Sequence, residues 1–138
     1  LPEKYTKGLS KKEKKEKTEN VKETKKLLKE GKKEEAYKKA SERPTVKSDK
    51  KSSYTIRFKK KFGNIKQKSK AMQEATGIPI AAQKEILKRG LGAFASAGSR
   101  ASVSSPQAWS IARFYSFYFN KGKSFDEDIV KKYNIKFK

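Results

Sequence analysis

Basic residues are concentrated in the first half of this 138-residue sequence and aromatic residues in the second half. This distribution limits where a core can form. Residues 1–70 hold 26 Lys and Arg against 10 Asp and Glu, whereas residues 71–138 hold 11 against 5. Ten of the 15 aromatic residues lie between Phe94 and Phe137, among them the single tryptophan, Trp109. Because burial of apolar side chains drives folding, we expect a C-terminal core and a largely solvated, basic N-terminal segment.

The sequence contains no cysteine and no histidine, which excludes several classes of functional site. Disulfides, thiolate nucleophiles, Cys/His zinc sites and imidazole proton shuttles all require these residues. We therefore expect a protein that is not an enzyme and that uses no cofactor, metal or small-molecule substrate. We also expect no secretory signal and no membrane span, because no uncharged apolar stretch approaches the roughly 20 residues of a spanning helix.

The residue pattern predicts an all-α fold in two parts, a basic helical arm over residues 1–51 and a compact helical core domain over residues 52–138. In the arm, a long helix is expected to begin after Ser10, which forms a capping box with Glu13. This helix contains only three apolar residues. It is therefore expected to be solvated or to lie on a partner. A second, short helix is expected over residues 32–41.

In the core domain, glycine, serine and proline separate the predicted helices. These helices are expected over residues 52–62, 65–76, 79–89 and 106–119. Residues 90–105 are rich in small residues and serine, which predicts a loop over at least part of them. Ser124 and Glu127 fit a second capping box at the start of a last short helix. Residues 126–128 are acidic and are expected to stabilise the N-terminus of that helix rather than to bind a metal.

Residues 71–90 permit two interpretations. A helix, a turn at Gly77 and a second helix follow one another in the proportions of a helix-turn-helix, which directs Gln83, Lys84 and Lys88 to the major groove of DNA. Motifs of this kind usually bury an aliphatic residue where this sequence has Gln83, so the match is incomplete. A plain helical hairpin uses the same turn and is the favoured interpretation.

A second candidate site is the loop that carries Ser99 and Arg100, just before an aromatic-rich helix. Serine hydroxyls, an arginine and the free N–H groups of a helix N-terminus can together bind a phosphate. Arg113 either points to the same site or pairs with Asp126 or Asp128. The alternative for the loop is a tight crossing of two helices at small residues, with no ligand.

Lysine runs form the most extensive candidate site, and on the predicted N-terminal helix they cover nearly every side. Lysine outnumbers arginine 32 to 5, which favours non-specific neutralisation of phosphates over bidentate recognition of guanine. A solvated helix of mixed charge is the alternative, since glutamates lie three and four residues from many lysines. The positive excess in residues 1–70 is larger than solubility requires, so a polyanion is the expected partner. The candidate residues for nucleic-acid or anion binding are Lys11, Lys12, Lys14, Lys15, Lys22, Lys25, Lys26, Lys59, Lys60, Lys61, Lys84, Lys88, Ser99, Arg100 and Arg113.

Short motifs spread over most of the chain carry a family resemblance. They are residues 89–94 (RGLGAF), 97–100 (AGSR), 106–109 (PQAW) and 7–12 (KGLSKK), with the pairs Ala112-Arg113, Arg43-Pro44 and Lys47-Ser48. In these motifs the chain resembles an uncharacterised family of small basic proteins encoded by large DNA viruses of algae and protists and by tailed phages. Ala95 and Ala101 depart from the family pattern, in which an aromatic residue and a proline are common at these places. The resemblance implies a viral protein packaged in or on the particle and implies no assigned activity.

These observations predict a non-enzymatic virion protein whose lysines bind viral DNA or another polyanion without sequence preference. We expect it in the virion and, during assembly, inside the host cell. The alternative is a minor structural component of a viral capsid or tail, whose basic arm clamps neighbouring virion proteins. Charge alone does not separate these two partners, because both present negatively charged surface.

Overall fold

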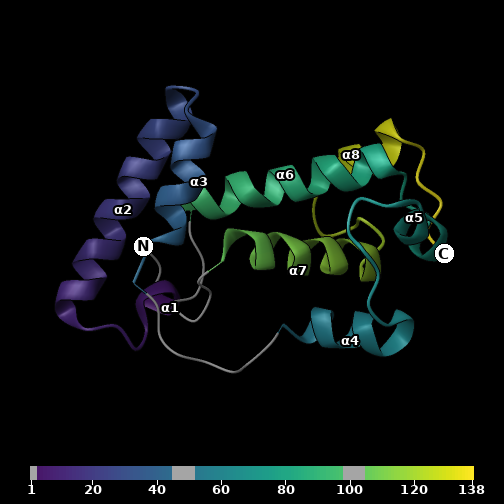
Figure 1. The fold of residues 1–138 in the computed structure, drawn as a ribbon, viewed down its shortest axis with the longest axis horizontal. Helices are drawn as coiled ribbons and strands as arrows, with labels where there is room; N and C mark the ends of the chain where they lie inside the picture. Colours follow the sequence, from purple (N-terminus) through teal and green to yellow (C-terminus); the bar gives the residue numbers. More distant parts are fainter. Residues whose placement is uncertain (1–2, 45–51, 98–104) are drawn as a thin grey trace. The chain divides into compact units, whose positions relative to one another are not determined.

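The computed structural model describes residues 3–44, 52–97 and 105–138, and within these ranges the protein is all-α, as predicted (Figure 1). The described residues form no strand, and none of their helices is long and apolar enough to cross a lipid bilayer. The helices are α1 (Glu3–Thr6), α2 (Lys11–Lys29), α3 (Lys33–Ser41), α4 (Ser53–Phe62), α5 (Lys70–Thr76), α6 (Ile80–Ala97), α7 (Pro106–Phe119) and α8 (Glu127–Lys132).

Contacts within the chain divide it into two compact units. The first unit consists of Leu1–Asp49 and Gly90–Trp109, and the second consists of Lys50–Arg89 and Ser110–Lys138. The helices α6 and α7 therefore contribute residues to both units. The division into a separate N-terminal arm and a C-terminal core domain stays a prediction.

In the first unit, α2 and α3 lie side by side (Figure 1). The predicted capping box forms at the start of α2: the Ser10 hydroxyl oxygen accepts from the Glu13 N–H at 3.2 Å, and the Ser10 N–H donates to Glu13 Oε1 at 3.1 Å. The buried residues of α2 recur every three or four positions and so share one face. Asn20 Nδ2 of α2 donates to the Lys39 carbonyl oxygen of α3 at 3.0 Å, which links the two helices.

A small apolar cluster forms the core of the first unit. Ala40 of α3 is buried against Phe94 and Ala95, which lie at the C-terminal end of α6. The ring centroids of Phe94 and Trp109 lie 5.9 Å apart. These contacts explain why residues from the middle of the chain belong to the N-terminal unit. Three half-buried side chains pack around the cluster: Leu28, Tyr37 and Trp109.

The second unit contains the larger, aromatic core. Phe58 of α4 is fully buried, and its ring stacks on Tyr115 of α7 with the centroids 4.2 Å apart. Phe117 of α7, Ile86 of α6 and Ile129 of α8 are fully buried in the same cluster. Met72 of α5 is buried there too, so five helices meet around one core that is rich in the aromatic residues of the C-terminal half.

Three predicted helices are confirmed to within one residue at each end. The predictions over residues 32–41, 52–62 and 106–119 correspond to α3, α4 and α7. At the end of α4, Gly63 has a φ of 77°, a conformation that glycine adopts without strain. Local signals account for α4, which ends at Gly63, and for α7, which begins at Pro106. Helix α3 has no capping side chain at its N-cap residue, Lys32.

The prediction that a helix stops at Gly90 was wrong, because α6 continues through Gly90 and Gly92 to Ala97. A glycine in a helix interior costs about 1 kcal/mol relative to alanine. Continuing the helix buries the ring of Phe94, and burial of such a side chain contributes about 1.5–3 kcal/mol. The predicted loop over residues 90–105 is therefore helical as far as Ala97, and residues 98–104 lie outside the described ranges.

Two other helices begin later than predicted. Helix α5 begins after Ser69, not at residue 65. The Gln83 amide bonds both the N–H and the carbonyl oxygen of Ser69, at 3.1 Å each, and so holds the preceding segment out of the helix. Helix α8 begins after Asp126, so the capping box predicted at Ser124 does not form.

Candidate nucleic-acid interface

Five lysines of α2 form one row along an exposed face of the helix. Side chains three, four or seven residues apart share a face, because the helix has about 3.6 residues per turn. The row extends over a helical rise of about 27 Å. All five side chains are exposed, and the exposed Lys14 and Lys26 flank them. The lysine row consists of Lys11, Lys15, Lys22, Lys25 and Lys29.

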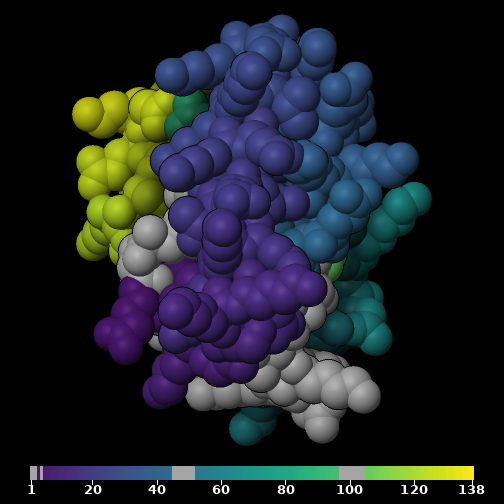
Figure 2. Space-filling view, turned by 90° about the vertical axis from the view of Figure 1, so that its left-hand side faces the viewer, coloured from purple at the N-terminus to yellow at the C-terminus, as the bar shows by residue number. Residues whose placement is uncertain are grey.

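The glutamates of α2 lie on a different side of the helix. At about 100° per residue, the lysine row and its two flanking lysines occupy a sector of about 120°, and every glutamate of α2 falls outside it. Glu23 forms an ion pair with Lys39 of α3 and, with Glu30, lines an open groove between α2 and α3. Figure 2 shows α2 at the centre of the view with α3 beside it.

The lysine row carries positive charge that no carboxylate of the described residues neutralises in an ion pair. No ion pair of the described residues joins a lysine of the row to a carboxylate, since Glu23 pairs with Lys39 and Glu30 with Lys32. The expectation that lysines cover nearly every side of this helix is corrected. Lys12 lies on the side of the glutamates, whereas the other predicted lysines of α2 gather on the opposite side.

Lys17 lies on the inner face of α2 and is only 3 % exposed. Its Nζ donates a hydrogen bond of 2.6 Å to the Tyr5 carbonyl oxygen and lies 5.9 Å from the centre of the Tyr5 ring. Burial, and after it the positive charge of Arg43, lowers the pKa of Lys17 to about 8. Lys17 therefore ties α1 to α2 and takes no part in the exposed row.

A second group of exposed lysines lies at the C-terminal end of α4, in the second unit. Lys59, Lys60 and Lys61 are all exposed. The Lys61 ammonium lies 5.1 Å from the centre of the Phe62 ring and 5.6 Å from that of Tyr118, and it donates to the Tyr118 hydroxyl at 3.4 Å. Cations at this end of a helix also interact favourably with the helix dipole.

On α6, Lys84 and Lys88 are exposed, but their neighbour Gln83 is fully buried. Gln83 Nε2 donates to the carbonyl oxygens of Ile78 and Ser69, and Gln83 Oε1 accepts from the Ser69 N–H. The helix-turn-helix interpretation, which directs Gln83 to the major groove, does not hold for this residue, because its amide is engaged within the fold. Lys84 and Lys88 remain as two exposed cations one helical turn apart.

Arg113 takes part in a network of ion pairs. Its Nη2 lies 3.3 Å from Asp126 Oδ2, and its guanidinium carbon lies 4.6 Å from the centre of the Phe125 ring. Arg89 bonds Asp126 at 3.1 Å and both oxygens of Asp128 at 2.8 and 2.6 Å. The hydrogen bonds between Arg89 and Asp128 raise the pKa of Arg89 and lower the pKa of Asp128. The structure thus places Arg113 with Asp126, the alternative to a phosphate contact.

Of the predicted site residues, seven lie on α2, three on α4 and three on α6 and α7, while Ser99 and Arg100 lie outside the described residues. Sequence reasoning missed four exposed cations that adjoin those of α4, and the signal that identifies them is simple. No Asp or Glu occurs between Asp49 and Glu74. The missed residues are Arg57, Lys66, Lys68 and Lys70.

Comparison with known proteins identifies a family. No curated protein and no solved structure matches the chain. The sequence model of one family of unknown function matches residues 2–136. The match includes the lysine row, the exposed end of α4 and the aromatic core. Because it covers nearly the whole sequence, the chain belongs to the DUF5824 family of unknown function.

Proposed function

We propose that this protein binds nucleic acid without sequence preference through the lysine row of α2, and that it acts without a catalytic step. The proposal rests on the separation of charge on α2, where every exposed lysine except Lys12 lies in one sector and the glutamates lie in another. A merely solvated helix gains stability from mixed lysines and glutamates on one face. On a face that carries only lysines, the positive side chains repel one another, and a bound polyanion removes this repulsion.

The chemistry of lysine favours contacts with phosphate over contacts with base edges. Each lysine that neutralises a phosphate releases condensed counterions, so binding weakens steeply as salt increases. A lysine ammonium is a point charge, whereas the bidentate recognition of guanine favours the planar fork of arginine. The lysine row contains no arginine. The proposed interaction therefore depends on the charge of the backbone and not on base sequence.

We further propose that the protein is viral and that its partner is viral DNA in the particle. The support is the resemblance of the glycine-rich and PQAW motifs to small basic proteins of large DNA viruses and tailed phages. A particle holds nucleic acid at very high concentration, so modest electrostatic affinity is sufficient for binding there. Mass spectrometry of purified particles from a virus that encodes the chain tests this setting, and absence of the protein from the particles contradicts it.

A salt series with matched variants tests nucleic-acid binding. The affinity for a labelled duplex of random sequence is measured between about 50 and 200 mM salt for the wild type and for two variants. The row variant changes all five residues of the lysine row to glutamine. The control variant changes five exposed lysines elsewhere to glutamine, namely Lys7, Lys33, Lys123, Lys131 and Lys136.

The two variants have the same net charge, so a difference in affinity between them depends on where the lysines lie and not on the total charge of the protein. We expect the row variant to bind more weakly and to reduce the slope of log affinity against log salt by about 4, because each phosphate contact contributes about 0.9 to the slope. The control variant should change the slope by less than about 1. Equal losses in both variants, or wild-type affinity that does not respond to salt, overturn the proposal.

A further inference from the structure

We propose that the second unit carries its own phosphate-binding surface, which contacts the nucleic-acid backbone independently of the lysine row. This inference rests on the function proposed above. We call this surface the α4 surface. It is formed by α4 and the segment that follows it as far as the start of α5. Its residues are Arg57, Lys59, Lys60, Lys61, Lys66, Lys68 and Lys70, and all of them are exposed.

The α4 surface concentrates positive charge more strongly than α2. Residues 57–70 hold seven basic residues and no acidic residue, a net charge of +7 over 14 positions. Helix α2 holds nine lysines against four glutamates, a net charge of +5 over 19 positions. No ion pair of the described residues involves a member of the α4 surface. Within the described part of the chain, no carboxylate is therefore paired with this surface.

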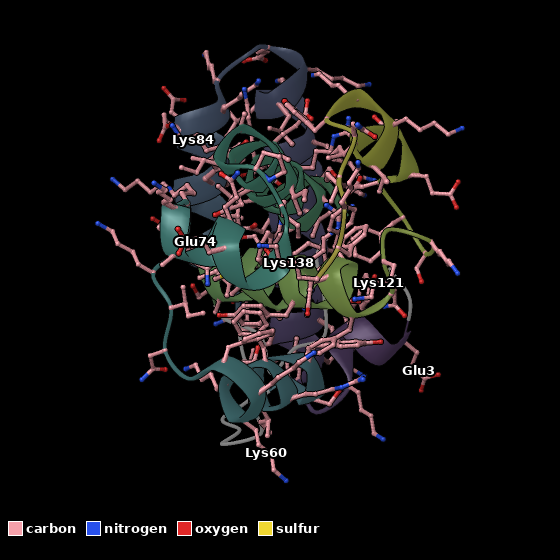
Figure 3. All side chains as sticks on the ribbon, turned by 90° about the vertical axis from the view of Figure 1, so that its right-hand side faces the viewer. Glu3, Lys60, Glu74, Lys84, Lys121 and Lys138 are labelled. Atoms are coloured by element: carbon pink, nitrogen blue, oxygen red, sulfur yellow. The ribbon has the colours of Figure 1, made fainter. Side chains whose placement is uncertain are left out.

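Aromatic rings hold two of these cations in place while leaving them exposed. The Arg57 guanidinium carbon lies 4.2 Å from the centre of the Phe119 ring. The Lys61 ammonium lies within 6 Å of the ring centres of both Phe62 and Tyr118. Cation–π contacts of this kind limit the freedom of the side chain and reduce the entropy lost on binding. Lys60 projects away from α4 on the outer side of the helix (Figure 3).

The segment that leads from α4 to the start of α5 exposes its lysines to solvent. Residues 65–70 alternate between half-buried and exposed, and the exposed ones are the three lysines of this segment. The half-buried residues are anchored: Gln67 Nε2 donates to the Tyr115 hydroxyl at 2.8 Å, and the Ser69 backbone is bonded by Gln83. Lys66, Lys68 and Lys70 are therefore directed outward by a fixed backbone rather than by a mobile chain.

The chemistry of the surface fits a phosphate backbone better than unpaired bases or a membrane. Proteins that bind single strands usually stack bases on exposed aromatic rings. The only large apolar residue that is exposed in the described part of the chain is Ile56 of α4. One isoleucine provides no stacking platform and too little apolar area for insertion into a bilayer. We therefore assign the surface to the backbone of a duplex.

The experiment compares an α4 variant with the row and control variants described above. The α4 variant changes Lys59, Lys60, Lys66, Lys68 and Lys70 to glutamine and keeps Arg57 and Lys61, which pack on rings. Duplex affinity and its salt slope are measured for each variant and for the combination of the α4 and row variants. Independent surfaces predict that the α4 variant reduces the salt slope by about 4 and that the log-affinity losses of the two variants add in the combination.

A footprint on the unmodified protein provides a second measurement that needs no variant. Lysines of the wild type are acetylated with and without a saturating duplex, and the modified positions are identified by mass spectrometry. We expect protection of Lys59, Lys60, Lys66, Lys68 and Lys70 as well as of the lysine row. The exposed Lys123 and Lys131, which belong to neither surface, should remain reactive.

The outcomes separate this inference from the proposed function. If the α4 variant binds within about twofold of the control variant and its lysines stay reactive, the α4 surface is rejected while binding through the row stands. If the wild type shows no salt-dependent binding to any duplex, the proposed function itself fails. Tighter binding to vesicles of anionic lipid than to duplex, lost in the α4 variant, also overturns the inference, because it assigns the surface to a membrane.

Discussion

The guanidinium of Arg43 donates a hydrogen bond of 2.7 Å to the carbonyl oxygen of Ala95, 52 residues further along the chain. The same side chain donates to the Phe94 carbonyl oxygen at 2.8 Å, to the Thr24 hydroxyl at 2.8 Å and to Asn20 Oδ1 at 2.7 Å. It is 6 % exposed and lies 5.2 Å from the centre of the Phe94 ring. One buried arginine thus joins α2 to the end of α6.

Replacement of Arg43 by leucine should destabilise the protein strongly. The substitution removes four hydrogen bonds from a charged donor, among them the bond to the Phe94 carbonyl oxygen, so we expect a loss of about 3 kcal/mol in the free energy of unfolding. Urea denaturation at neutral pH measures this loss. The exposed Lys123→Gln is the control and should change stability by less than about 0.5 kcal/mol. If Arg43→Leu also changes the free energy of unfolding by less than about 0.5 kcal/mol, Arg43 has no structural role.

The lowered pKa of Lys17 predicts that stability rises with pH. The pKa of this buried lysine is about 8 in the folded protein, against an ordinary value of 10.5. Between these values the folded state has lost the proton that the unfolded chain still holds, so unfolding takes up a proton and its free energy increases with pH. The contribution is complete above about pH 10.5 and is lost as the pH falls through about 8.

The Lys17→Met variant isolates this effect from other titrating groups. We expect the difference in unfolding free energy, wild type minus variant, to increase between pH 7 and 10, because methionine has no proton to lose. The exposed Lys22→Met is the control, and its difference from the wild type should stay constant over the same range. A constant difference for Lys17→Met means that Lys17 keeps its proton in the folded protein.

Signals contained within a few residues were predictable from the sequence. The capping box at Ser10 and Glu13 and the stop at Gly63 depend on neighbours within one helical turn, and the structure confirms both. The location of the larger core was also predictable, because aromatic residues are concentrated near the C-terminus. In the candidate site, the sequence identified the lysines but not the side of α2 on which each lies.

Features that depend on distant contacts were not predictable from one sequence. The continuation of α6 past Gly90 depends on the burial of Phe94 in the first unit, to which α2 and α3 also belong. Gln83 bonds the backbone of Ser69, 14 residues earlier in the chain, and no pattern of neighbouring residues predicts this hydrogen bond. The sequence shows Arg43 only as part of the Arg43-Pro44 pair and gives no sign of its four hydrogen bonds. In each case a tertiary contact outweighed the local preference.

Asp126 should contribute more to stability than Asp128, although both pair with Arg89. The Asp126 side chain is 7 % exposed and also contacts Arg113, whereas that of Asp128 is 64 % exposed. We expect Asp126→Asn to lower the free energy of unfolding by about 2 kcal/mol, because it leaves Arg113 without its carboxylate. Asparagine tolerates the φ of 57° at this position, so the change tests charge and not backbone strain.

The matched substitution Asp128→Asn serves as the control for Asp126→Asn. An exposed ion pair contributes little, so we expect Asp128→Asn to lower the free energy of unfolding much less than Asp126→Asn does. Thermal unfolding followed by circular dichroism measures both variants. Equal losses for the two variants contradict the assignment of Asp126 as the centre of the network.

Gly77 and Gly92 should respond to alanine with opposite signs. Gly77 has a φ of 80°, and a Cβ atom there overlaps the Lys136 carbonyl oxygen, in a segment that the Lys138 N–H ties to the Thr76 carbonyl oxygen at 3.0 Å. Gly77→Ala should therefore lower the free energy of unfolding by more than about 1 kcal/mol. Gly92 lies inside α6 with no atom within 4 Å of an added Cβ, so Gly92→Ala should raise the same quantity by about 0.5–1 kcal/mol. Urea denaturation of the two variants compares the signs directly, and stabilisation by Gly77→Ala contradicts the packing of the C-terminal segment against this turn.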